Sequence, residues 1–101
     1  MRRRKDRPGG IGAVVVEIDG VTAPARFDEL PDALAALWES LRALPLGAVQ
    51  ADAFHYFLTR PDAAEHVTEF VRRDGALLLS FAMGGRSHAV RLRPVGEAEQ
   101  C

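Results

Sequence analysis

The sequence contains a single cysteine, Cys101, and no apolar run that approaches the roughly twenty residues of a transmembrane helix. One cysteine excludes a framework of internal disulfides and is typical of a protein kept in a reducing compartment. No charged and then apolar leader with a small-residue cleavage site follows Met1. We therefore expect a cytoplasmic protein that has no membrane partner.

The sequence also lacks the motifs that would indicate an enzyme. The glycine-rich residues 9–12 precede a predicted strand, whereas a phosphate-binding loop follows one, and no Walker lysine or dinucleotide fingerprint is present. His55, His66, His88 and Cys101 have none of the short pairwise spacings of zinc sites. We predict a non-catalytic protein with no cofactor and no metal site.

Lysine is almost absent, because Lys5 is the only one, and we interpret the preference for arginine as that of a GC-rich, bacterial genome. The formal net charge is only −1, but it is unevenly distributed. Residues 11–70 contain ten acidic side chains against three arginines, whereas residues 71–95 contain five arginines against Asp74. This asymmetry can steer a charged partner to one surface of the protein.

The charge pattern predicts two binding surfaces. The first is an acidic group for a protein partner, made of Asp28, Glu29, Asp32 and Glu39. The second is a basic group for an anionic partner, made of Arg72, Arg73, Arg86, Arg91 and Arg93. Since one group is acidic and the other basic, self-association is a further expected mode of binding.

Residues 75–94 have the alternating pattern of a β-hairpin closed by Gly84-Gly85. A two-residue turn assigns the cross-strand pairs Met83 with Arg86, Phe81 with His88, Leu79 with Val90 and Leu77 with Leu92. In this register most apolar side chains share one face, and a shift by one residue would mix the two faces. The apolar face is the surface on which we expect the rest of the chain to pack.

The first half of the chain predicts two strands and a helix. Val14, Val16 and Ile18 alternate on one face of a strand, and Asp19-Gly20 follows as a tight turn. Residues 21–27 predict a short strand at an edge of the sheet, because Pro24 has no N–H. Asp28 is the predicted N-cap of the helix that follows. The apolar stripe of that helix is Leu30, Leu34, Leu37, Trp38, Leu41 and Leu44, and Pro45 and Gly47 end it.

Residues 50–58 fit two structures. As a strand they place Phe54, Tyr56 and Leu58 on one side, and as a helix they group Phe54, Phe57 and Leu58. The density of aromatic residues favours a central strand. A second helix then follows, with Thr59 as N-cap and Pro61 in its first turn, and it ends at Gly75. Its apolar stripe is Ala63, Val67, Phe70 and Val71.

These elements predict the α+β class. We expect a two-layer sandwich with a mostly antiparallel sheet, two helices on one face, the order β-(β)-α-β-α-β-β and a C-terminal β-hairpin. Residues 11–95 would form a single domain. Residues 1–10 would be a disordered basic arm and residues 96–101 a frayed tail.

The segment IDGVTAPARFDELPDALAALWESL, residues 18–41, resembles the opening of the barstar-family ribonuclease inhibitors. Those proteins begin with a strand, an Asn-Gly or Asp-Gly turn and a helix entered through a similar acidic-Leu pattern. The segment ADAFHYFLT, residues 51–59, is similar to their second helix. The resemblance covers the first half of the chain, and the family's aromatic-Gly-Asn-Leu-Asp-Ala-Leu stretch is absent from this sequence. It implies an acidic, partner-binding α+β protein.

Two functional hypotheses follow. In the first, the protein is a small binding or regulatory module, like an immunity protein or an inhibitor, that engages another protein through its acidic first half or a sheet edge. In the second, residues 50–58 and 62–73 form a helix-turn-helix, residues 75–94 form the wing, and the basic group contacts DNA. The acidic residues of the would-be recognition helix, Asp62, Glu65 and Glu69, favour the first hypothesis.

Overall fold

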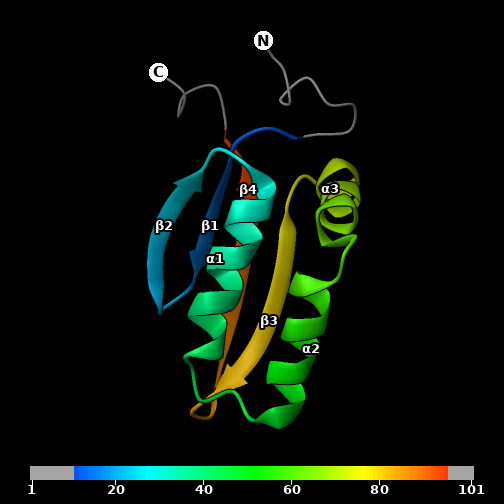
Figure 1. Cartoon of the computed structure of the whole chain (residues 1–101). Coiled ribbons are helices and arrows are strands. Elements are labelled where there is room, and N and C mark those ends of the chain that lie inside the picture. The colour runs from blue at the N-terminus through cyan, green and yellow to red at the C-terminus, as the bar shows by residue number, and fades with distance from the viewer. Residues whose placement is uncertain (1–10, 96–101) are drawn as a thin grey trace.

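Four strands and three helices make up residues 11–95, the part of the chain that the computed structural model describes (Figure 1). In chain order they are β1 (Val14–Ile18), β2 (Thr22–Phe27), α1 (Leu30–Arg42), α2 (Ala48–Thr59), α3 (Ala63–Asp74), β3 (Leu77–Met83) and β4 (Arg86–Pro94). The predicted basic arm, residues 1–10, and the predicted tail, residues 96–101, lie outside the described residues.

The strands form one antiparallel sheet in the order β2-β1-β4-β3, so β2 and β3 are its edges. The helices cover one face of this sheet (Figure 1). The structure therefore confirms the α+β class, the antiparallel sheet and the edge position of the strand that contains Pro24. No helix within residues 11–95 is long and apolar enough to cross a membrane.

The predicted hairpin register is confirmed in every pair, from Met83 with Arg86 to Leu77 with Leu92. Gly84 and Gly85 both have positive φ, 61° and 79°, as the favoured two-residue turn requires. The helix-facing side of the hairpin is apolar, and Val90 and Leu92 are completely buried. The local alternation and the turn residues were enough to specify this element.

The core lies between the helix-facing side of the sheet and the apolar stripes of the helices. From β1 it receives Val14, Val16 and Ile18, as predicted, and from α1 it receives Leu34, Leu37 and Leu41 among others. Val67 and Val71 of α3 also belong to it, and Trp38 and Phe70 pack at its margin. The predicted stripes of both helices are therefore confirmed.

The prediction of a strand at residues 50–58 is wrong, because these residues belong to α2. The physical reason is that Ala48, Ala51 and Ala53 favour a helix, while an aromatic-rich segment with apolar residues on two sides fits either structure. Phe54 and Leu58, four residues apart, are the buried side chains of this helix. The helix count is three rather than two, and the order becomes β-β-α-α-α-β-β.

Two predicted helix caps are also corrected. The N-cap position of α1 is Glu29 rather than Asp28, whose carboxylate lies 3.4 Å from Arg26 instead. Thr59 is the last residue of α2, where its hydroxyl donates a hydrogen bond to the carbonyl of His55 at 2.6 Å. Both errors arise because a short polar side chain near a helix end can bond to other nearby groups instead of capping the N-terminus of the helix.

The turn between α2 and α3 is held by an ion pair, in which Arg60 Nε donates to Asp62 Oδ1 at 2.6 Å. This hydrogen bond lowers the pKa of the Asp62 carboxyl. Since a lowered folded-state pKa keeps the carboxylate charged, the contact is present at neutral pH and is lost only as the pH falls through that lowered value.

Replacing Gly75 with alanine is expected to reduce the free energy of unfolding by about 1 kcal/mol. Gly75 ends α3 at φ 87°, with its N–H bonded to the carbonyl of Val71 at 2.7 Å. A Cβ there would meet no atom within 4 Å, so the cost is conformational and not steric. Gly75→Asn should cost less than Gly75→Ala in urea titrations, because asparagine tolerates this left-handed backbone. Equal costs for both variants would contradict the explanation.

Candidate functional site

The predicted acidic group lies on α1 and the turn before it. Asp28 is paired with Arg26, and Glu39 is paired with Arg42 at 3.3 Å. Asp32 and Glu39 are exposed and seven residues apart, so they share one side of the helix. The structure thus places the acidic group on α1 and the turn before it, and α1 lies beside α2 (Figure 1).

The predicted basic group is divided among three places. Arg72 and Arg73 are in the last turn of α3, and Arg73 pairs with Asp74 and lies over the ring of Phe70. Arg86 follows the hairpin turn, at the opposite end of the molecule from α3 (Figure 1). Of the five residues, the structure brings Arg91 and Arg93 together on the outer face of β4, which the helices do not cover.

Arg26 of β2 also lies on the outer face of the sheet, although it belongs to residues 11–70, the acidic part of the sequence. Val15 is opposite Arg26 on β2 and opposite Arg93 on β4, so the two arginines flank it. Val15 is 7% exposed although it faces away from the core, as expected when long arginine stems cover it. In the next row, Glu17 is opposite Arg91, and their charged atoms are 3.8 Å apart.

The hairpin is part of the sheet, because β4 pairs with the whole length of β1, from Val14 to Ile18. Within residues 11–95 the sheet has two strands with a free side, β2 and β3, and β2 contains Pro24, which has no N–H to offer to a partner. The free side of β3 is therefore the candidate site.

Half of the backbone N–H and C=O groups of β3 point away from β4, because β3 is an edge strand. The two-residue turn makes Met83 and Arg86 a hydrogen-bonded pair, and the alternation of an antiparallel ladder then directs the groups of Leu78, Ser80 and Ala82 outward. No backbone hydrogen bond joins the outward groups of Leu78 and Ser80 to another residue within 11–95.

Ala82 is different because a side chain of α2 has taken the place of a neighbouring strand. The amide of Gln50 donates to the carbonyl of Ala82 at 2.8 Å and accepts from its N–H at 2.8 Å. The same amide nitrogen also donates to the carbonyl of Leu46 at 2.8 Å. This pair of hydrogen bonds closes one end of the edge and shows that it accepts an amide partner.

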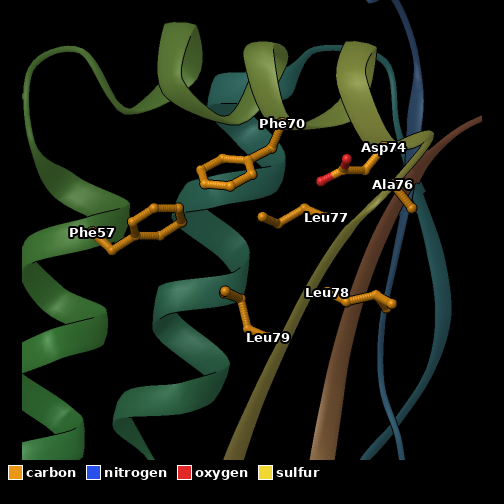
Figure 2. Close-up of a pocket in the computed structure, with 7 residues that line it drawn as sticks. All are labelled: Phe57, Phe70, Asp74, Ala76, Leu77, Leu78 and Leu79. Carbon is orange, nitrogen blue, oxygen red and sulfur yellow. The ribbon is translucent and has the colours of Figure 1, made fainter.

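A cleft of about 250 Å³ opens beside the remaining free part of the edge. Figure 2 shows Phe57 of α2 and Phe70 of α3 projecting toward Leu77 and Leu79 of β3, with Asp74 at the rim. The rings of Phe57 and Phe70 pack edge to face, with centroids 6.4 Å apart. The cleft is smaller than the roughly 300–1,000 Å³ of ordinary small-molecule sites, and its lining is mostly apolar.

A large apolar side chain is exposed on the edge strand itself, because Leu78 of β3 is 61% exposed. Val49 and Tyr56 of α2 are also exposed, at 84% and 64%, but they lie on the side of α2 opposite its buried Phe54 and Leu58. Apolar surface next to unpaired backbone groups, as at Leu78, is typical of a protein-binding site.

No binding role was predicted from the sequence for Gln50, Phe57 or Phe70, although a sheet edge was named as a contact surface for a protein partner. Gln50 was the one available signal, since it is a polar residue on the side of α2 that also presents Phe54 and Phe57 to the sheet. His55, His66 and His88 lie on α2, α3 and β4, and residues 11–95 contain no cluster of three or more potential metal ligands.

Amide exchange should distinguish the closed and open parts of this edge. We expect the Ala82 N–H to exchange slowly and the outward Ser80 N–H to exchange rapidly in the native protein. Gln50→Ala should make the Ala82 amide exchange rapidly and lower the free energy of unfolding by about 1 kcal/mol. If the Ala82 amide stays slow in Gln50→Ala while the protein remains folded, the contact does not protect the edge.

Comparisons with protein-family models, with curated proteins and with solved structures found no match to this chain. The resemblance to the barstar family is therefore confined to residues 18–41 and 51–59, on which it was based. What the protein does has to be argued from the geometry of the site.

Proposed function

We propose that the protein is a small, non-catalytic binding module that engages another protein through the free edge of β3. The observation that carries this proposal is the pair of unpaired outward backbone groups at Leu78 and Ser80 beside the cleft between α2, α3 and β3. Edge strands with these features bind an extended segment of a partner as an added strand.

Of the two contact surfaces considered for a protein partner, the sheet edge has the stronger support. The acidic residues Asp28 and Glu39 have arginine partners within their own segment. The groups of Leu78 and Ser80 have no such partner in the described part of the chain. Unpaired backbone groups next to apolar surface gain both hydrogen bonds and apolar burial when a strand binds.

Proline at position 80 tests this function. The Ser80 N–H makes no bond within the sheet, so Ser80→Pro removes the group offered to a partner while keeping the ladder to β4. Ser80→Ala is the matched control because it keeps the N–H. We expect wild type and Ser80→Ala to capture the same stoichiometric protein from a cell extract, and Ser80→Pro to lose it while still showing a cooperative unfolding transition.

Two outcomes would contradict the proposal. Capture that survives in Ser80→Pro but is lost in Asp32→Arg would assign binding to the acidic group instead. Salt-sensitive binding of duplex DNA that is unaffected by Ser80→Pro and abolished by Arg91→Glu would support the DNA-binding hypothesis.

A further inference from the structure

We infer that the partner segment is an extended strand with a large apolar residue at its centre and an acidic residue beside it. This inference rests on the proposed function and adds the chemistry of the bound segment. It follows from the register of β3, the lining of the cleft and the charges on the outer face of the sheet.

The register limits the length of the contact. Gln50 occupies the backbone groups of Ala82, which leaves those of Ser80 and Leu78 for the incoming strand. If the partner strand runs antiparallel to β3, two of its residues, separated by one, lie opposite Ser80 and Leu78 and form up to four backbone hydrogen bonds with them. The residue between them lies next to Leu79.

The position next to Leu79 determines which side chain enters the cleft. Side chains alternate across a strand, so the central partner residue points to the helix side, as Leu79 does. There it meets the apolar lining formed by Phe57, Phe70 and Leu77 (Figure 2). The cleft thus selects a large apolar side chain such as leucine or phenylalanine at the centre.

The two flanking side chains of the segment fall on the outer face, where the rows of the sheet carry different charges. The row of Leu78 continues through Arg91 to Glu17. The row of Ser80 continues to Ala89, which has no charge. Arg91 is half exposed and only loosely paired with Glu17, at 3.8 Å, so its guanidinium can bind a second carboxylate reaching over Leu78.

Arg91 is the charged residue of β4 in the row of Leu78. Arg26, on the same outer face, already has a carboxylate partner in Asp28, at 3.4 Å. The preference for an acidic partner residue opposite Leu78 therefore rests on Arg91, whereas the flanking residue opposite Ser80 lies in the row of the small, neutral Ala89.

A displayed library of random twelve-residue peptides, selected on the wild-type protein, tests this chemistry. We expect the enriched peptides to share a large apolar residue with Asp or Glu next to it, and Ser80→Pro to weaken their binding at least ten-fold. Ser80→Ala should bind them as wild type does. In a fluorescence titration, changing the acidic residue of an enriched peptide to lysine should weaken binding about five-fold.

A charge-swapped variant supplies the matched control. Glu17→Arg combined with Arg91→Glu keeps the cross-strand ion pair and reverses the charge next to Leu78. This double variant should prefer the lysine peptide over the acidic one.

The outcomes separate the inference from the proposed function. Peptides that bind in a Ser80-dependent way but without an acidic preference, or without a switch in the double variant, would overturn the inferred chemistry and leave strand addition standing. Peptides that bind equally to Ser80→Pro would overturn both.

Discussion

Replacing Leu41 with alanine is expected to lower the free energy of unfolding by about 2–5 kcal/mol. Leu41 is completely buried in the core between α1 and the sheet. Truncation removes apolar contacts and leaves a cavity that the closely packed surroundings fill only in part. Since small domains are stable by roughly 5–15 kcal/mol, this single change would remove a large part of the total.

Leu78→Ala is the control for Leu41→Ala, because the same atoms are removed from a side chain that is 61% exposed. We expect a change below about 0.5 kcal/mol for Leu78→Ala in urea or thermal unfolding. Similar losses for the two variants would mean that Leu78 is covered in solution and that the outer face of the sheet is occupied by another chain.

The elements that the sequence predicted well are those whose information is local. The hairpin could be predicted from the alternation of residues 77–92 and the Gly84-Gly85 turn, and every predicted cross-strand pair was correct. The apolar stripe of α1 could be predicted from the 3.6-residue period of its leucines. In both cases neighbouring residues carry a consistent signal, so no knowledge of the distant chain was required.

The candidate site could not be predicted in the same way because it depends on contacts between distant segments. The hairpin register directs the Ser80 N–H away from β4, but that no further strand pairs with it follows only from knowing that β3 is an edge and that β4 pairs with β1. The bond from Gln50 to Ala82 joins residues 32 positions apart. The cleft needs α2 to be a helix, which the sequence analysis considered but did not prefer.

Ala53→Pro should lower the free energy of unfolding by about 3 kcal/mol, because Ala53 is in the middle of α2. Proline removes the helical N–H and its ring clashes with the preceding turn. Ala53 is exposed, so the loss would reflect the backbone and not lost packing. Ala48→Pro, at the first residue of α2, should be close to neutral, since proline is tolerated there.

Ala53→Val makes the same test sensitive to the type of secondary structure. Valine is less favourable than alanine in a helix, so we expect a loss of about 0.5 kcal/mol in α2, whereas in a strand valine would stabilise the protein. Urea unfolding of Ala53→Pro, Ala48→Pro and Ala53→Val, followed by far-ultraviolet circular dichroism, measures whether each change raises or lowers the free energy of unfolding. A gain in stability for Ala53→Val would contradict a helix at residues 48–59. Without that helix, Phe57 and Gln50 would no longer border β3. The cleft and the closed end of the edge, on which the proposed binding mode depends, would then be absent.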